Sequence, residues 1–180
     1  MRKLTFGLAA AAALLSSPLA QASQSARHQA QELQHSKLTL IEAIIAAEKQ
    51  DGGRTTSAAF NFKRGNPAFY QVTVLSRDGR KLTQYDLDPQ SGGVRDTHNE
   101  VLEKLLTRIS PDNLRSTPTT LTHAVYVAQQ QSGGRALSAD VDRKGDHLEY
   151  TVETVKLDGT SHKVKIDGST GKVVSDDEEK

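Results

Sequence analysis

Two segments of the sequence occur twice in the same order, and this duplication constrains the fold more than any other feature. Residues 40–54 (LIEAIIAAEKQDGGR) correspond to residues 121–135 (LTHAVYVAQQQSGGR), 81 positions later. Residues 70–79 (YQVTVLSRDG) correspond to residues 150–159 (YTVETVKLDG), 80 positions later. Offsets that shrink by one residue are what small deletions in loops leave behind. The sequence therefore predicts two tandem units that share one plan.

Each unit begins with a predicted amphipathic helix. Thr39 is suited to cap the first helix, because Glu42 three residues later completes the pattern of a capping box. Thr119 and Thr120 are the candidates to cap the second helix. Each helix runs into Gly-Gly, which accepts the left-handed conformation that often ends a helix. The predicted apolar faces are Leu40, Ile41, Ile44, Ile45 and Ala47 or Glu48 in the first helix and Leu121, Ala124, Val125 and Ala128 in the second.

Each helix is followed by residues with the pattern of antiparallel strands. Strand candidates occupy residues 58–63 and 137–142, and each precedes a predicted hairpin with Asp-Gly at its turn. In the first hairpin Tyr70, Val72 and Val74 alternate with polar residues, which indicates one buried face. We therefore expect an α+β fold of two tandem repeats, each an α-helix packed on a small antiparallel β-sheet. Whether the two sheets join is left open.

The N-terminus has the parts of a signal peptide. Arg2 and Lys3 precede an apolar run that is too short to span a membrane. Ala20-Gln21-Ala22 then has the small-x-small form that signal peptidase cleaves. We predict cleavage after Ala22 and a periplasmic or secreted protein that has no membrane span after cleavage.

Charge and composition exclude several classes of function. Removal of residues 1–22 takes away two of the 23 basic side chains, which leaves 21 against 22 acidic ones. A nearly neutral chain lacks the attraction to phosphate that nucleic-acid binding requires, so we expect no nucleic-acid partner. The sequence has no cysteine, which excludes disulfides, thiolate metal ligands and a cysteine nucleophile.

The predicted organisation has six segments. In order, they are a signal peptide (1–22), a polar and exposed lead-in (23–36), a first repeat (37–95), a helical linker (96–117), a second repeat (118–175) and an acidic tail (176–180). Within the linker, the apolar spacing between His98 and Ile109 predicts an amphipathic helix that ends at Ser110-Pro111-Asp112. The acidic tail has no apolar residue, and we expect it to be disordered.

The second repeat carries the pattern of a known family. Its hairpin and final turn combine Tyr150, Val152, Asp158, Gly159, Val164, Ile166, Asp167, Thr170, Gly171, Lys172 and Val173. This pattern resembles the PepSY domain, and the first repeat departs from it at Pro89 and at Ser91-Gly92-Gly93. The resemblance implies small α+β units in an exported protein. It also implies a relation to the propeptides of thermolysin-like metalloproteases, where such modules are thought to restrain the enzyme. At the level of fold, tandem units of this kind are similar to beta-lactamase inhibitor proteins as well.

The sequence shows no set of residues that predicts catalysis. It has no HExxH zinc helix, no Gly-x-Ser-x-Gly elbow and no phosphate-binding Gly-rich loop, so we expect no enzyme activity and no cofactor. His147 and His162 are weak metal candidates, because they could face each other across the second hairpin; an incidental surface pair is the alternative. Four recurring acids fit turns better than catalytic pairs, namely Asp78, Asp88, Asp158 and Asp167.

Loops and sheet edges are therefore the predicted binding surface, since an exposed edge can accept an extended peptide as a further strand. The candidate partner-binding residues lie in turns: Asn66, Arg77, Asp78, Gly79, Arg80, Asp158 and Gly159. Ordinary solvated turns are the alternative interpretation. The sequence favours a protein-binding module whose partner is another envelope protein, such as a protease that it regulates or inhibits. The alternative is a periplasmic sensor of a small ligand or metal.

Overall fold

The structure, a computed structural model, describes residues 18–62, 65–107 and 109–179. Its helices are α1 (Pro18–His35), α2 (Leu40–Asp51), α3 (Leu102–Leu106), α4 (Pro111–Ser116) and α5 (Leu121–Ser132). Its strands are β1 (Arg54–Asn61), β2 (Phe69–Leu75), β3 (Leu82–Leu87), β4 (Val94–Asn99), β5 (Arg135–Lys144), β6 (His147–Val155), β7 (Ser161–Asp167) and β8 (Val173–Glu179). Most of the predicted signal peptide, residues 1–17, lies outside the described residues.

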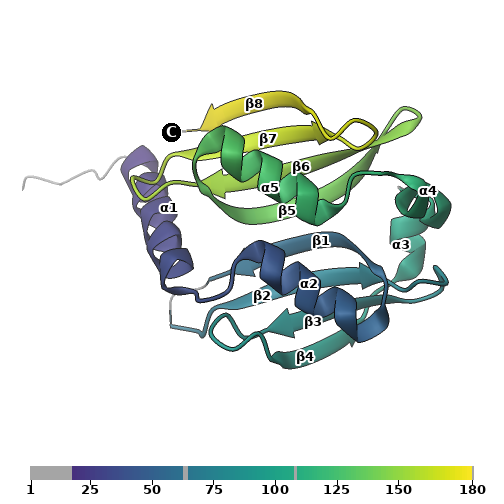
Figure 1. Cartoon of the computed structure of the whole chain (residues 1–180). Coiled ribbons are helices and arrows are strands. Elements are labelled where there is room, and N and C mark those ends of the chain that lie inside the picture. The colour runs from purple at the N-terminus through teal and green to yellow at the C-terminus, as the bar shows by residue number, and fades with distance from the viewer. Residues whose placement is uncertain (1–17, 63–64, 108, 180) are drawn as a thin grey trace, which may run out of the picture.

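All eight strands form one antiparallel sheet in the order β4-β3-β2-β1-β5-β6-β7-β8 (Figure 1). Each half of the chain supplies a helix followed by four strands, and the halves meet where β1 pairs with β5. That central pairing is short, with Ser57, Ala58 and Ala59 opposite Asp140, Ala139 and Ser138. The fold is thus α+β with a single sheet, which answers the question of whether two small sheets join.

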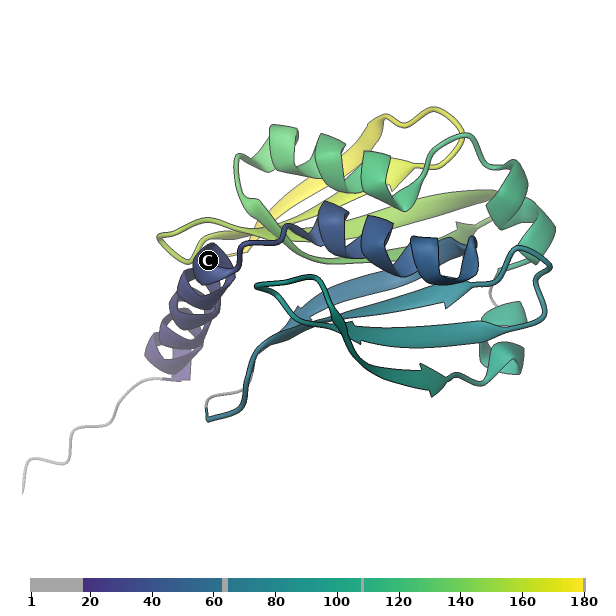
Figure 2. The same ribbon diagram turned by 60° about the horizontal axis from the view of Figure 1, so that its bottom comes forward.

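Helices α2 and α5 lie side by side on one face of the sheet (Figure 2). As predicted, Thr39 caps α2 in a complete capping box with Glu42; Thr120 accepts a hydrogen bond from the amide of His123 at the start of α5. The buried residues of α2 are Leu40, Ala43, Ile44 and Ala47, and those of α5 are Leu121, Ala124, Val125, Ala128 and Ser132. This i, i+3, i+4, i+7 spacing defines the face toward the sheet. The prediction that Ile45 belongs to that face is wrong, because Ile45 is 41% exposed.

The core lies between these two helices and the sheet. The alternation predicted for the hairpins is confirmed, since buried and half-buried residues alternate through β2, β3, β6 and β7. The inward side chains include Tyr70, Val72, Val74, Leu87, Tyr150, Val152, Val164 and Ile166, all fully buried. Because the same face of β1–β3 and β5–β7 is apolar, one continuous core holds both halves together.

Helix α1 corrects the prediction of a polar, exposed lead-in. Residues 18–35 form a helix that packs against the rest of the molecule, and Ala30 and Leu33 are each only 1% exposed. At its side, His28 lies against the Phe62 ring, with 5.6 Å between the ring centroids. Ala30 and Leu33 are two apolar residues in a segment rich in glutamine, so the amphipathic pattern in the sequence is weak. The sequence therefore indicated a solvated segment.

The predicted linker helix and the predicted disordered tail are also wrong. His98 lies in β4, which pairs with β3, and the linker holds two short helices, α3 and α4, in place of one. Pro111 begins α4, where a missing amide hydrogen costs nothing. The acidic residues 176–179 belong to β8, which pairs with β7 along its length. Acidic side chains on an edge strand oppose further pairing, so they are compatible with a strand at this position.

Two arginines at corresponding positions tie the halves together. Arg54, just after the Gly-Gly that ends α2, donates hydrogen bonds to the carbonyls of Leu114, Arg115 and Thr117, which lead into α5. Arg135, just after the end of α5, donates to the carbonyls of Leu33 and Leu38, which lead into α2. Each half therefore fixes the start of the other half's helix. We call Arg54 and Arg135 the clamp arginines.

We predict that Arg54→Met lowers the free energy of unfolding by about 2 kcal/mol, because it leaves carbonyls at a partly buried site without their charged donor. Arg135→Met should have a similar effect, and Arg54→Lys should not restore stability, because an ammonium group lacks the guanidinium fork. Urea unfolding followed by far-ultraviolet circular dichroism measures this. The exposed Arg80→Met is the control, and equal midpoints for R54M and R80M would contradict a clamping role.

Candidate functional site: the open face of the sheet

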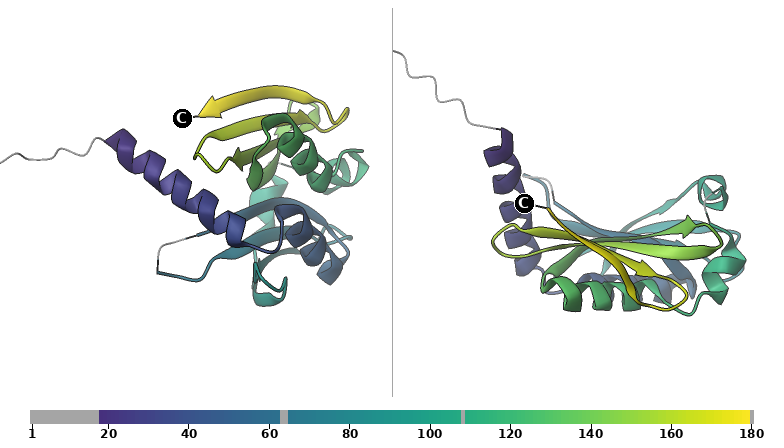
Figure 3. Two further views of the ribbon diagram at one scale, coloured as in Figure 1. Left: turned by 60° about the vertical axis from the view of Figure 1, so that its left-hand side comes forward. Right: turned by 90° about the horizontal axis from the view of Figure 1, so that it is seen from above.

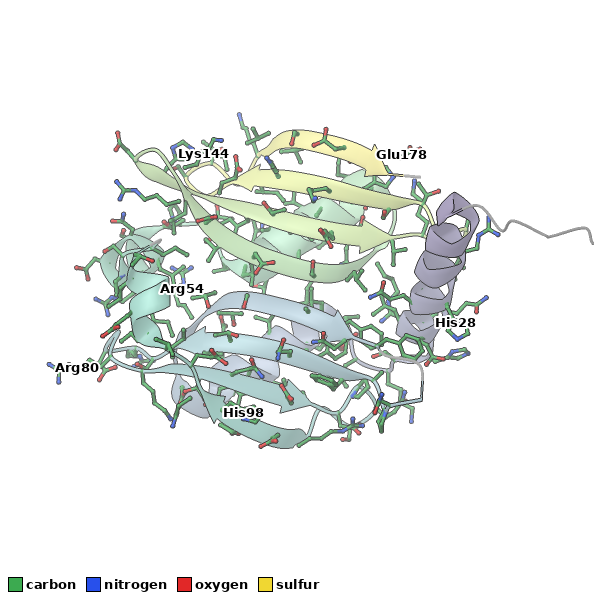
Figure 4. The ribbon with its side chains drawn as sticks, turned by 180° about the vertical axis from the view of Figure 1, so that it is seen from behind. His28, Arg54, Arg80, His98, Lys144 and Glu178 are labelled. Atoms are coloured by element: carbon green, nitrogen blue, oxygen red, sulfur yellow. The ribbon has the colours of Figure 1, made fainter. Side chains whose placement is uncertain are left out.

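The face of the sheet opposite α2 and α5 is open (Figure 3, right). Figure 4 shows this open face directly, with α1 at one end and α3 at the other. An antiparallel sheet can keep one face in water provided its outward side chains are polar. The open face is therefore a surface that the fold leaves available for binding.

Cross-strand pairing arranges the side chains of the open face in rows. One row runs across all eight strands and consists of His98, Gln84, Thr73, Ser57, Asp140, Thr151, Lys165 and Ser175. The next row consists of Asp96, Asp86, Gln71, Ala59, Ser138, Glu153, Lys163 and Asp177. Neither row contains a large apolar side chain, so these rows are suited to hydrogen-bonded contacts and not to the burial of an apolar ligand.

Charge is unevenly distributed over this face. In the part contributed by β5–β7, Lys163 lies 3.8 Å from Glu153 and Lys165 lies 4.0 Å from Glu149, and Ser138 donates to Glu153 at 3.2 Å. These ion pairs are partly exposed and contribute little to stability. The part contributed by β1 and β2 carries uncharged amides and hydroxyls in the same rows. A partner lying across the sheet would meet neutral and charged surfaces side by side.

A hollow marks each end of the open face. A groove of about 310 Å³ runs beside α3, where Leu105 and Val101 face Thr73, Gln84 and Asp140 of the sheet. A smaller pocket of about 110 Å³ lies beside α1, between Gln29 and the residues around Glu153 and Lys163. Helices α1 and α3 therefore border the open face and give a polar surface raised walls.

The sequence-predicted binding turns lie at the ends of the sheet, and the structure does not bring them together. Arg77, Asp78, Gly79 and Arg80 form the β2–β3 turn at the end of the sheet where α4 lies, and Figure 4 shows Arg80 there, far from His28 on α1. Asp158 and Gly159 form the β6–β7 turn, whose main chain accepts a hydrogen bond from Arg27 of α1. Asn66 is exposed in the β1–β2 loop.

Neither hairpin turn projects freely into solvent. Gly79 and Gly159 adopt φ angles of +72° and +90°, and a Cβ added to them would lie 3.0 Å from Pro111 and 2.7 Å from Arg27. Helix α4 thus packs on the turn of the N-terminal half, and α1 packs on the turn of the C-terminal half. These glycines serve the docking of helices, while the side chains of Arg77, Asp78, Arg80 and Asp158 stay exposed.

The proposed histidine pair does not form. His162 pairs with Thr154 across β6 and β7, seven residues along β6 from His147, which places the two histidines roughly 23 Å apart. His147 lies 3.3 Å from Asp167, and His162 is buried with its Nδ1 2.9 Å from Asp176. Within the described ranges, no three His, Asp or Glu side chains gather as a metal site would require. The metal interpretation of this pair is therefore wrong.

The recurring acids are turn residues, as predicted. The Asp88 carboxylate is paired with Arg95 and accepts from the amides of Gln90 and Ser91, and together these hold the pKa of Asp88 well below its usual range. Hydrogen bonds from the side chain and amide of Thr170 likewise lower the pKa of Asp167. Asp78 and Asp158 also have a lowered pKa, from hydrogen bonds within their turns. Such acids stay ionised and satisfied, which does not suit a general acid or base.

The second half of the chain matches a family model. Residues 120–177, from the cap of α5 into β8, match the model described as "Peptidase propeptide and YPEB domain", or PepSY. These residues form a PepSY domain. The resemblance drawn from the hairpin and its Asp-Gly and Thr-Gly-Lys turns is confirmed. The PepSY domain supplies α5 and four of the eight strands, including half of the open face.

Other comparisons add little to the PepSY domain. No curated protein matches the sequence. A crystal structure of a presumed lipoprotein from Clostridium difficile 630 aligns with a TM-score of 0.44 and 15% identity, over 76% of this chain and 88% of that one. A likeness at that level supports no statement about function. None of the helices in the described part of the chain has the length and hydropathy of a membrane span.

Sequence reasoning missed the clamp arginines and the open face. A signal existed for the first, because Gly-Gly-Arg recurs 81 positions later, where β5 of the PepSY domain begins. A signal existed for the second in the polar alternate positions of every strand. Neither pattern identifies the residues that its side chains contact in the other half. Those contacts depend on the register between β1 and β5, which the sequence of either half alone does not determine.

Asp88 supplies a pH prediction. Because its pKa is lowered in the folded protein, its contribution to stability is present above the ordinary aspartate pKa of about 3.9 and is lost as the pH falls below that value. The stability gap between wild type and Asp88→Asn should therefore be widest above about pH 5 and should shrink toward pH 2. Urea midpoints across this range measure the gap. Asp146→Asn, in the exposed β5–β6 turn, is the control, and a gap that stays constant with pH would contradict the assignment.

Proposed function

We propose that this chain is an exported, non-enzymatic PepSY protein that binds another envelope protein across its open sheet face. The observation that carries the proposal is the uncovered, polar, eight-stranded face bordered by α1 and α3 (Figure 4). Polar faces of this kind form hydrogen-bonded, water-containing interfaces, which are typical of transient complexes.

Regulation of a protease is the more specific form of the proposal. Its support is the description of the matching family, which includes peptidase propeptides. A propeptide acts by contact with its enzyme and not by chemistry of its own. The carboxylates of Asp88 and Asp167 have a lowered pKa because they accept hydrogen bonds within their turns, which is consistent with a protein that binds and does not catalyse.

We also infer that the chain consists of two tandem PepSY-like repeats. Support comes from the matching order of helix and four strands in each half, and from paired residues with the same role. Tyr70 donates to the carbonyl of Leu38 before α2, and Tyr150 donates to the carbonyl of Thr119 before α5. The clamp arginines are a second such pair.

A cross-linking experiment tests the open face. We place a photoreactive benzoylphenylalanine at Thr73 or Thr151 on the open face, and at Tyr126, which is 54% exposed on α5, as the matched control. In envelope extract, the two open-face positions should cross-link the same protein and Tyr126 should not. If that protein is a protease, its purified activity should fall when the mature chain is added, and Thr73→Arg should relieve the inhibition.

Two results would contradict binding through the open face. One is equal cross-linking from Tyr126 and from the open-face positions. The other is the absence of any cross-link from Thr73 and Thr151 while circular dichroism shows that both variants are folded.

Export makes a separate prediction. We expect the protein recovered from the bacterial envelope or medium to begin at Ser23, because the predicted cleavage follows Ala22. Intact-mass spectrometry and N-terminal sequencing measure this. Replacing Ala20 and Ala22 by large residues should leave the precursor uncleaved, and retention of an intact N-terminus in the unaltered protein would contradict the prediction.

A further inference from the structure

A pocket at one corner of the molecule gathers three arginines. It lies where the end of α2, the β2–β3 turn and α4 meet, and it has a volume of about 280 Å³. Arg54, Arg77 and Arg115 line it together with the apolar side chains of Leu75 and Leu114. No acidic residue is among the described residues that line it. The corner is distinct from the open face, and the proposed function does not use it.

The three guanidinium groups are engaged to different degrees. Nη1 of Arg54 is occupied by the carbonyls at the end of α4, and its Nη2 has a weak contact of 3.5 Å with the Thr119 carbonyl. Arg115 donates to the Arg77 carbonyl and pairs with Asp112, whose side chain is 86% exposed. Arg77 uses only its Nε, at 3.4 Å from the Gly52 carbonyl. Its two terminal nitrogens have no acceptor among the described residues.

The opposite corner of the molecule provides an internal comparison. There Arg135 has the role of Arg54, and its contact with the Leu33 carbonyl matches that of Arg54 with the Leu114 carbonyl. The residues that correspond to Arg77 and Arg115 are Leu157 and Gln34. Leu157 is 66% exposed and carries no charge. At each corner a second arginine, carried by a helix, binds the turn: Arg115 donates to the Arg77 carbonyl and Arg27 donates to the Asp158 carbonyl. Arg77 is therefore the arginine of the first corner that the helix docking does not require.

We propose that this arginine pocket binds an oxyanion, a carboxylate or phosphate group of a small ligand. A guanidinium presents a planar fork of N–H donors that matches the oxygens of carboxylates and phosphates. Arg77 has unused donors at the mouth, Arg115 and Arg54 add positive charge, and Leu75 and Leu114 form an apolar floor. The acids nearby are already engaged: Asp112 is paired with Arg115, and Asp78 accepts from Ser76 and from the amide of Arg80.

The test uses the folded mature chain and two probes at constant ionic strength. Inorganic phosphate is one probe, and N-acetyl-leucine, which joins a carboxylate to an apolar group, is the other. With at least one probe, we expect the chemical shifts of the Nε–H groups of Arg77 and Arg115 to change saturably, with a Kd on the order of millimolar. N-acetyl-leucinamide, which lacks the charge, should cause no change. Binding of phosphate alone assigns a phosphate ligand, and binding of N-acetyl-leucine assigns a carboxylate ligand.

The double variant R77L/R115Q copies the opposite corner and leaves the clamp arginine Arg54 in place. It should keep the circular dichroism spectrum of the wild type and bind the probes about tenfold more weakly or worse, because the charge-assisted donors are lost. Leu157→Arg, which adds a charge at the other corner, should leave binding at Arg77 unchanged. The proposal is overturned if neither probe gives a saturable change, or if folded R77L/R115Q binds as tightly as the wild type.

Discussion

The structure depends on the hydrogen bonds that each clamp arginine donates to the main chain just before the sheet-covering helix of the other half. The carbonyl of Leu38 accepts from Arg135 at 3.1 Å and from Tyr70 at 2.8 Å, and the carbonyl of Thr119 accepts from Tyr150 at 2.6 Å. Burial raises the pKa of both tyrosines, so their hydroxyls remain donors. The central strands share only a short pairing, and these contacts give the two halves a fixed relative position. They also place α2 and α5 on the same face, which leaves the other face open.

The open face and the edges of the sheet have different prospects as binding surfaces. The edge strand β8 carries successive acids, and every residue of the other edge strand, β4, is exposed, with Arg95, Asp96 and His98 among them. Charges on edge strands discourage the addition of a further strand. The open face combines hydroxyl, amide and charged side chains from β3 to β6, and a partner can contact them without adding a strand. Binding across the face is therefore favoured over the strand addition that the sequence pattern suggested.

The elements that the sequence predicted well are those with local signals. The capping box of α2, the glycines that end α2 and α5 in the left-handed conformation, and the alternation in the hairpins are all legible within a few residues. The elements that it missed depend on distant partners. β4 shows no apolar alternation because neither of its faces is buried, and α1 buries mainly Ala30 and Leu33. The turn role of Asp88 could be predicted, but its pairing with Arg95 depends on a strand that could not.

Similarity and difference between the halves separate structure from function. Residues that hold the fold occur at corresponding places in both halves, as the clamp arginines and the two buried tyrosines do. Outward-facing residues at corresponding places differ: Arg77 stands where the other half has Leu157, and Thr73, Gln84 and Asp86 stand where it has Glu153, Lys163 and Lys165. A fold that needed only stability would have no reason to distinguish its two corners or its two half-faces. The positions where the halves diverge are therefore the ones at which recognition is to be sought.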